Sequence, residues 1–251
     1  MLGTFGRGIY VLDDYSALRS LAPERLRAEA TLLSVSPALL YLQDNPLGGN
    51  GVAFQGAAHY FAPNPPVGAT FTYHLRAALR TQRAARQTRE TALNRTGADV
   101  PFPGWDSLKV EQEEEAPSIE VEVSDASGAV VSRFGGTNSA GTNRVTWNLR
   151  WPSVAPIGGA AGAGGGGFGG GGGGGAGSGT LGGNGPYVVP GSYRVQLFKR
   201  VAGVRIALTQ PAPFEVQLLP NSTLTPAQRE RAVAFQRDAQ VRNAWCSALT
   251  R

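Results

Sequence analysis

Hydrophobic and polar residues alternate along seven segments of the chain, which is the pattern of strands that bury one face. In residues 69–75, Phe71, Tyr73 and Leu75 share one side, while threonines and His74 share the other. The other segments are residues 119–123, 130–134, 143–149, 193–197, 204–208 and 214–218. Turn residues separate them, as in the Asp-Ala-Ser-Gly run at 125–128. The sequence therefore predicts a mainly β protein, an antiparallel immunoglobulin- or fibronectin-III-like β-sandwich.

Three other segments lack this alternation and favour helices. They are residues 76–95, 106–115 and 226–249. The first contains Ala, Leu, Gln and Arg without Gly or Pro, a composition with strong helix propensity. Asp106 is expected to cap the second helix, and Thr225 before Pro226 is expected to begin the third. Residues 76–116 would thus be a helical insertion in the sandwich, and a helix would close the chain.

The first residues predict a strand without a local partner. Residues 9–12 are Ile-Tyr-Val-Leu, a short β-rich run that ends at Asp13 and Asp14. A lone strand exposes unpaired edges and needs neighbours. We therefore expect it to dock on the later domain or to pair with strands outside this sequence. Residues 23–68 are rich in Pro and Gly and are expected to wrap around the protein as a loop.

Glycine is concentrated in one tract. Of the 35 Gly in 251 residues, 19 lie between Gly158 and Gly185. The tract has no Gly-X-Y repeat, which excludes collagen, and no Gly-x-x-x-x-Gly-Lys motif, which excludes a phosphate-binding P-loop. It lies between the strands of Trp147 and Tyr193. We expect a loop without fixed structure there, because lengthening a loop between paired strands costs little free energy.

The net charge of +5 comes from an uneven distribution along the chain. Residues 76–95 hold six Arg and one acid, whereas residues 106–115 hold five acids and one Lys. The arginines from Arg80 to Arg89 step by three and spread over about half of a helix. We therefore expect the two segments to face each other or solvent, and we expect no binding of nucleic acid. No apolar run is long enough to span a bilayer.

Candidate catalytic and metal-binding residues are few. Asp13 and Asp14 would point to opposite faces of a strand, unlike paired glycosidase carboxylates, and are expected to form a turn or a cap. The two histidines, His59 and His74, have no nucleophile near them in the sequence. The single Cys246 excludes a disulfide framework and is expected to pack as a small hydrophobe. The sequence thus predicts no catalytic residue, no metal site and no cofactor.

Two tryptophans are candidates for stacking on a ligand. Trp147 lies in the inward register of its strand and is expected in the core. Trp151 precedes Pro152 at the end of that strand, where an exposed ring can stack on a sugar. Trp151 is therefore the one candidate ligand contact, with carbohydrate as the ligand.

The chain opens with the run Gly-Thr-Phe-Gly-Arg-Gly-Ile-Tyr-Val-Leu-Asp-Asp-Tyr-Ser-Ala-Leu-Arg. This run resembles the segment that ends the β-propeller of bacterial sortilin-like, BNR-repeat proteins that are named glycosyl hydrolases, and later segments resemble the C-terminal region of the same proteins. Asn-Arg-Val-Thr-Trp-Asn-Leu-Arg-Trp-Pro and Pro-Gly-Ser-Tyr-Arg-Val follow in the family's order. The similar segments are residues 3–19, 63–73, 119–134, 143–152 and 190–195. The chain departs from the family at Phe5, where His is common, and it contains no Ser-x-Asp-x-Gly-x-x-Trp box.

The resemblance implies a piece of a larger secreted, periplasmic or cell-envelope protein. Its expected regions are 1–22, the end of an upstream β-propeller; 23–68, a wrapping linker; 69–219, the sandwich with its insertion 76–116 and glycine loop 158–185; and 220–251, the C-terminal helix. The implied function is non-catalytic, either bracing the propeller or interacting with carbohydrate or protein. Two alternatives stay open: a substrate-binding part of a sialidase- or glucanase-like hydrolase, and an independent adhesion or protein-binding module. Without an Asp box, the resemblance transfers no enzyme activity to this chain.

Overall fold

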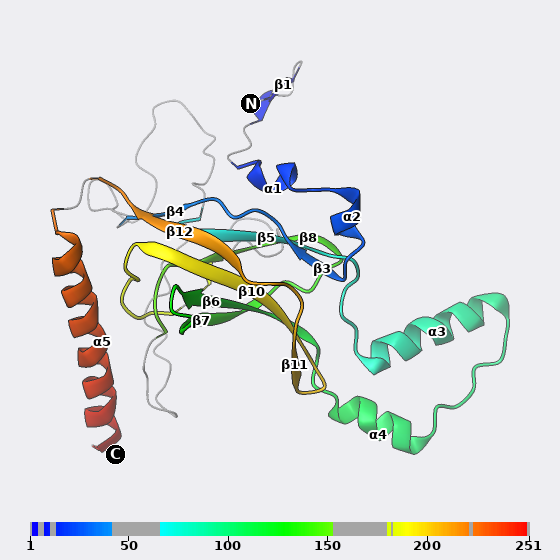
Figure 1. Cartoon of the computed structure of the whole chain (residues 1–251). Helices are drawn as coiled ribbons and strands as arrows, with labels where there is room; N and C mark the ends of the chain where they lie inside the picture. The colour runs from blue at the N-terminus through cyan, green and yellow to red at the C-terminus, as the bar shows by residue number, and fades with distance from the viewer. Residues whose placement is uncertain are drawn as a thin grey trace, which may run out of the picture.

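The computed structural model describes residues 2–4, 8–10, 14–41, 66–152, 180–181, 183–220 and 223–249. Over these residues the protein is a sandwich of a six-stranded and a four-stranded sheet (Figure 1). All seven segments with alternating hydrophobicity are strands. The predicted fold class is therefore confirmed: the protein is mainly β, with a helical insertion and a C-terminal helix.

The larger sheet has the strand order β4-β12-β10-β6-β7, and β11 pairs with the end of β10. Its strands are β4 (Ala38–Leu40), β6 (Ser118–Asp125), β7 (Val130–Gly136), β10 (Gly191–Val201), β11 (Val204–Ala207) and β12 (Ala212–Leu218). The β6–β7 turn follows from its sequence. Asp125 Oδ1 accepts the backbone N–H groups of Ser127 and Ala129 at 2.9 and 3.0 Å, and Gly128 has a φ of +89°. These contacts close the predicted hairpin.

The smaller sheet has the order β3-β5-β8-β9. Its strands are β3 (Ala30–Leu32), β5 (Ala69–Leu75), β8 (Gly141–Trp147) and β9 (Thr180–Leu181). Most strand pairs are antiparallel, but β4 pairs with β12 and β9 pairs with β8 in parallel. The sandwich is thus not purely antiparallel, because these two short strands come from segments predicted as loops.

Residues 14–41, which we call the N-terminal arm, fasten the two sheets together. The arm contains α1 (Ser16–Arg19) and α2 (Pro23–Leu26), followed by β3 and β4. β3 pairs with β5 in one sheet, and β4 pairs with β12 in the other. This part of the predicted linker is therefore integral to the sandwich, whereas residues 42–65 lie outside the described residues.

The core lies between the sheets and consists of their inward-facing side chains. Four aromatic rings meet there with centroids 5.2–6.4 Å apart; they belong to Phe71, Trp147, Tyr193 and Phe214. Trp147 is fully buried, and its indole N–H donates to the carbonyl of Arg150 at 3.2 Å. Burial also raises the pKa of Tyr73 and Tyr193 to about 12. The inward register predicted for Trp147 is confirmed.

The N-terminal hairpin consists of β1 (Leu2–Thr4) and β2 (Gly8–Tyr10), which pair antiparallel. The prediction of a strand without a local partner is therefore wrong, because residues 2–4 supply one. Among the described strands, neither β1 nor β2 pairs with the two larger sheets. The hairpin extends beyond α1, away from the sandwich (Figure 1).

The helical insertion forms a protrusion at one side of the sandwich (Figure 1). It contains α3 (Gln82–Thr96) and α4 (Trp105–Glu113). Thr81 caps α3, since its Oγ1 accepts the N–H of Ala84 at 3.1 Å. The prediction that Asp106 caps α4 is wrong: the N-cap is Gly104, with a φ of +85°, and Asp106 lies in the first turn. A carboxylate in a first turn still favours the helix dipole.

The C-terminal helix α5 (Pro226–Leu249) runs along the side of the sandwich opposite the insertion (Figure 1). Thr225 and Gln228 form a reciprocal cap, in which Gln228 Oε1 accepts the N–H of Thr225 at 2.9 Å and Thr225 Oγ1 accepts the N–H of Gln228 at 3.4 Å. The predicted start of this helix is confirmed. None of the helices in the described part of the chain is both long and apolar enough to cross a bilayer.

The end of the glycine tract is fixed against the strand that precedes the tract. The carbonyl of Gly183 accepts the Asn148 side-chain amide at 2.8 Å, and the N–H of Gly185 donates to the carbonyl of Trp151 at 2.9 Å. A Cβ at Gly183 would lie 2.0 Å from that Trp151 oxygen, so a larger residue does not fit. The prediction of no fixed structure is therefore wrong for residues 180–185 as far as they are described. Residues 153–179 lie outside the described residues.

Candidate functional site

The N-terminal arm begins at a network of hydroxyl groups around Asp14. Asp14 Oδ1 accepts the N–H of Ser16 at 2.8 Å, and Asp14 Oδ2 accepts the hydroxyl of Ser36 at 2.9 Å. The hydroxyls of Ser16 and Ser36 lie 2.9 Å apart, and Ser34 Oγ donates to the carbonyl of Ser16 at 2.7 Å. These bonds tie α1 to the chain between β3 and β4. The start of the arm is therefore held against the chain that links the two sheets.

Asp14 is suited to this role because it is stabilised as an anion. Hydrogen bonds from Ser16 and Ser36, together with the charge of Arg144 on β8, hold its pKa below the ordinary value of 3.8. The pKa is lower in the folded protein, so the network favours folding above that ordinary value and loses this contribution as the pH falls. Asp14 thus caps a turn, as predicted, while Asp13 lies outside the described residues.

His74 is not part of a catalytic arrangement among the described residues. His74 lies on the outward face of β5, in register with Thr31 of β3 and Thr142 of β8. Its buried Nδ1 has no hydrogen-bond partner within the described ranges. A Ser-His triad requires a nucleophile bonded to the imidazole, which His74 lacks there. His59 lies outside the described residues.

Trp151, the predicted ligand contact, is half-buried and packs against the core. The guanidinium of Arg237 on α5 lies over its ring, 3.8 Å from the ring centroid. A hollow of about 220 Å³ beside this pair is lined by Val130, Val131, Pro152, Gln240 and Val241 as well. A sugar stacks on a free aromatic face, so the Arg237 contact leaves less of this ring available than the sequence suggested.

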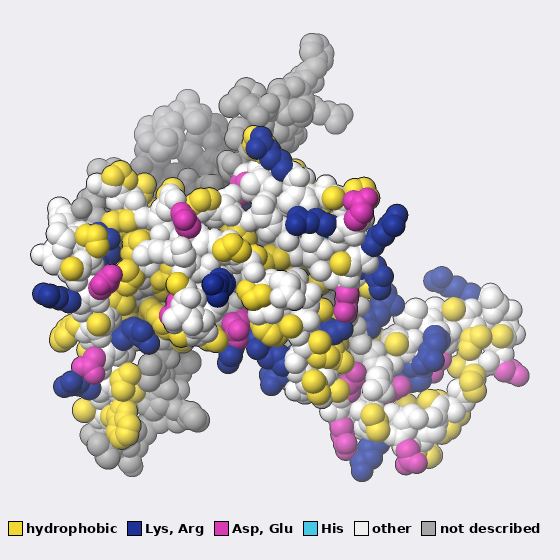
Figure 2. Space-filling model, viewed as in Figure 1, with side chains coloured by type: hydrophobic (Ala, Val, Ile, Leu, Met, Phe, Trp, Pro, Cys, Tyr) yellow, Lys and Arg dark blue, Asp and Glu magenta, His cyan; other side chains and the backbone are white. Residues whose placement is uncertain are grey.

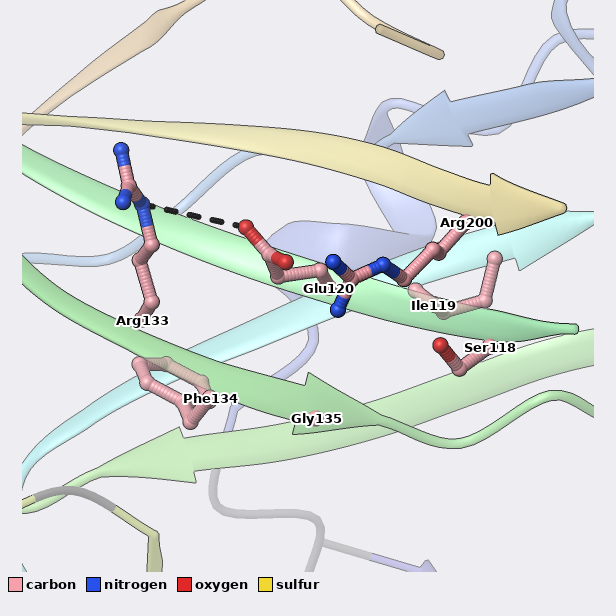
Figure 3. A pocket seen from close by; sticks show the side chains of 7 residues that line it. All are labelled: Ser118, Ile119, Glu120, Arg133, Phe134, Gly135 and Arg200. Carbon is pink, nitrogen blue, oxygen red and sulfur yellow. Dashed lines mark ion pairs between the residues drawn. The ribbon is translucent and has the colours of Figure 1, made fainter. Parts of the chain in front are cut away.

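A second hollow lies at the end of β6, β7 and β10 and has a volume of about 250 Å³ (Figure 3). Its charged side chains come from Glu120, Arg133 and Arg200. Arg133 Nε lies 3.8 Å from Glu120, as the dashed line in Figure 3 marks. Arg205 binds both Glu120 and Glu122 at 2.7 Å, so arginines hold both carboxylates of this open sheet face. This arrangement is a charge ladder across strands, which stabilises a sheet.

The basic and acidic segments of the insertion face each other, which is one of the two arrangements that the sequence left open. Arg86 of α3 binds Glu111 of α4 through Nε and Nη2 at 2.8 and 2.9 Å, and it binds Glu90 of its own helix at 2.5 Å. The hydrogen bonds and charge of Arg86 hold the pKa of Glu111 below its ordinary value. Glu114 accepts the backbone N–H of Gln82 at 2.7 Å. The protrusion is thus fastened by polar contacts, with basic, acidic and hydrophobic groups side by side on its surface (Figure 2).

Cys246 is exposed on α5 beside Trp245, which is 70% exposed. The prediction that Cys246 packs as a small hydrophobe is therefore wrong, because this end of α5 extends past the sandwich (Figure 1). Within the described ranges, no group of three or more His, Cys, Asp or Glu side chains is placed to hold a metal ion.

No family model, curated protein or solved structure matches this chain. The resemblance to sortilin-like, BNR-repeat proteins therefore stays a prediction.

Three contacts of the candidate sites were missed in the sequence. The serines that bind Asp14 carry only a weak signal, the Ser-x-Ser spacing of Ser34 and Ser36. The stacking of Arg237 on Trp151 joins residues far apart in the chain and has no local signal. The exposure of Phe102 and Trp105 did have a local signal. Both lie in the Pro-Phe-Pro-Gly-Trp break, where no helix continues that could bury them on one face.

Proposed function

We propose that this chain is a non-catalytic accessory region of a larger secreted protein of the sortilin-like, BNR-repeat kind, and that it braces a β-propeller. The observation that carries the proposal is the β1–β2 hairpin. It pairs with neither larger sheet among the described strands. A two-stranded hairpin is marginally stable alone, and its edges can accept further strands. A propeller blade supplies such strands.

The N-terminal arm makes the hairpin suitable as an anchor. β3 and β4 insert into different sheets, so the chain after the hairpin is attached to both layers of the sandwich. The Asp14 network then restrains α1, the first element of the arm. The arm therefore gives a strand that enters a propeller from this end of the chain a firm attachment on the sandwich side, which is what bracing requires.

A sugar-binding role at Trp151 has less support, because Arg237 covers the ring and no exposed aromatic platform surrounds it in the described part of the chain. A hydrolase role also has less support. Glu120 and Glu122 share one face of β6, but arginines pair with both on an open sheet surface. A glycosidase needs one acid and one base or nucleophile facing the same bond in a cleft.

Hydrogen exchange tests the bracing function. In the 251-residue chain we expect the amides of β1 and β2 to exchange quickly, while those of β5, β6, β8 and β10 stay protected. In a polypeptide that also carries the propeller, the hairpin amides should become protected. A variant lacking residues 1–13 should unfold at the same urea concentration as the whole chain. Strong protection of the hairpin in the isolated chain, with unfolding of the sandwich on its removal, would instead make it an internal part of this domain.

A further inference from the structure

We infer that the outward face of α5 is a dimerisation surface, on which a second copy of this chain docks with its own α5 antiparallel. This face, which we call the α5 seam, consists of Phe235, Asp238, Arg242 and Trp245. The four residues are spaced by three, four and three positions, which is the spacing of a stripe that packs on another helix. The inference is separate from bracing a propeller and does not depend on it.

The α5 seam is open to solvent. Phe235 is 73% exposed and Trp245 is 70% exposed, and hydrophobic side chains lie between charged ones along this helix (Figure 2). Gln240, which lines the hollow beside Trp151, lies about 160° around the helix axis from Arg242. α5 therefore packs on the sandwich through its other side. An exposed apolar patch with polar groups beside it is typical of a protein interface.

The four residues of the seam match one another when the helix is rotated about a two-fold axis. If two antiparallel α5 helices are centred at residue 240, Phe235 lies at the level of Trp245 of the other copy, because each is five residues from the centre. Asp238 then lies at the level of Arg242 of the other copy, because each is two residues from it. One centre thus gives two aromatic layers around two ion pairs. An isologous interface requires this self-complementarity, whereas a surface for an unrelated protein does not.

The charges in the middle of the seam favour the antiparallel arrangement over the parallel one. In a parallel pair, Asp238 would lie beside Asp238 of the other copy and Arg242 beside Arg242, so like charges would repel. In the antiparallel pair, every neighbour across the interface has the opposite charge. Asp238 and Arg242 already form an ion pair of 2.8 Å within one helix, so the dimer would join two such pairs into a network of four ions.

Neighbouring residues do not oppose this contact. The five positions that flank the seam are uncharged: residues 232, 234 and 239 are Ala, residue 241 is Val and residue 246 is Cys. Arg237 is turned toward the ring of Trp151. Arg231 lies about 13 Å along the axis from the centre of the seam, which separates the Arg231 residues of the two copies by about 27 Å. Since the seam is short, we expect a reversible dimer.

Charge reversal in the whole chain, followed by sedimentation equilibrium, is the most specific test. Asp238→Arg leaves only arginines in the middle of the seam, and Arg242→Asp leaves only aspartates. Each variant alone should dimerise about tenfold more weakly or worse. An equal mixture of the two, with one labelled by a fluorophore, should form a heterodimer. The double variant Asp238→Arg/Arg242→Asp should dimerise as the unaltered chain does, because every pair across the interface is restored.

The aromatic layers are tested by truncation, with a matched control for each kind of change. Phe235→Ala and Trp245→Ala should each weaken dimerisation about tenfold or more, since each change acts twice in a two-fold pair. Trp105→Ala removes a tryptophan that is 78% exposed in the α3–α4 protrusion, residues 81–114. Glu230→Arg reverses an exposed charge of α5 outside the seam. Neither control should change the dimer, and circular dichroism should show all variants folded because every changed side chain is exposed.

Three results would overturn the inference. One is a monomer even at about 1 mM chain, a concentration that detects very weak association. Another is a dimer that Phe235→Ala and Asp238→Arg leave unchanged, which would place the interface on another surface. The third is a loss of the dimer in both charge variants that neither their mixture nor the double variant restores, which would mean that these residues do not pair across an antiparallel interface.

Discussion

The sandwich and the α3–α4 protrusion use the same types of residue in opposite ways. In the sandwich, Trp147 is fully buried among Phe71, Tyr193 and Phe214. In the protrusion, Trp105 is 78% exposed and touches one other ring, that of Phe102. The sandwich is stabilised mainly by removing apolar surface from water, whereas ion pairs and helix caps hold the protrusion together.

The two regions should therefore respond to different perturbations. Loss of buried volume should unfold the sandwich cooperatively and leave no residual structure. Loss of charge pairing should open the protrusion locally, since the sandwich does not depend on its contacts. The N-terminal arm should respond to these perturbations as the sandwich does, and α5 should show an intermediate response.

The largest effect is expected from replacing a buried tryptophan by alanine, with an exposed tryptophan as the comparison. Trp147→Ala should lower the free energy of unfolding by about 3–5 kcal/mol, because it leaves a cavity in the aromatic cluster. Trp105→Ala should change it by less than about 0.5 kcal/mol, as an exposed substitution does. Urea denaturation followed by circular dichroism measures both. Similar losses in the two variants would mean that the protrusion is part of the cooperative core.

A smaller loss is expected where the backbone of the sandwich closes tightly. Gly68 has a φ of +134°, and a Cβ there would lie 1.9 Å from the carbonyl oxygen of Trp147. Gly68→Ala should therefore destabilise the protein by about 2–3 kcal/mol. Gly97, at the end of α3, has a φ of +69° and open space around it, so Gly97→Ala should cost about 1 kcal/mol through backbone strain alone. Thermal unfolding compares the two, and an equal shift in Tm would contradict the packing argument.

The protrusion should open in acid while the sandwich stays folded. The pKa of Glu111 is lowered in the folded state by Arg86, so the pair stabilises the protrusion above the ordinary value of 4.5 and is lost as the pH falls through the lowered value. The protection of the α3 and α4 amides against hydrogen exchange, each compared with the intrinsic exchange rate at the same pH, should fall several-fold in acid.

Variants of the same helix provide the control for this pH effect. Arg86→Gln should open the protrusion at neutral pH and abolish most of the pH dependence, whereas Arg95→Gln should leave both unchanged. If α3 and α4 separate at the same pH in all three proteins, a group other than Glu111 controls their contact.

The smallest effect concerns α5. Arg237→Ala removes the guanidinium over Trp151 and should weaken the docking of α5 by about 0.5–1 kcal/mol, the strength of an exposed cation–π contact. Exchange of the α5 amides and the fluorescence of Trp151 report on this step. Arg231→Ala removes the same charge from another side of α5, and an identical response to both changes would argue against the stacking.

Much of the fold was predictable because its signals are local. The alternation in residues 69–75 and 193–197 identified both strands and their buried faces. The turn at 125–128 and the Thr225 cap were also correct, since each depends on contacts within a few residues. The opposite charges of α3 and α4 left two arrangements open, facing each other or facing solvent, and the Arg86–Glu111 pair shows that the helices face each other.

The errors arose where a residue's environment depends on distant parts of the chain. β4 is three residues of a Pro-rich segment, and it is a strand only because β12 offers it an edge. The sequence predicted that Cys246 is packed, but it is exposed on a helix that extends beyond the sandwich. The end of the glycine tract is ordered by hydrogen bonds to Asn148 and Trp151, which no feature of the tract itself indicates.

The sequence by itself therefore determined the two-layer β fold, its buried positions and the charge opposition within the insertion, because hydrophobic periodicity and turn chemistry act over short distances. Only the tertiary structure decided that the arm fastens both sheets, that Arg237 covers Trp151 and that Phe102 and Trp105 stay exposed. Those outcomes depend on which elements meet in space. In a sandwich, the elements that pack together are widely separated along the chain, so the local sequence pattern carries no information about which of them come into contact.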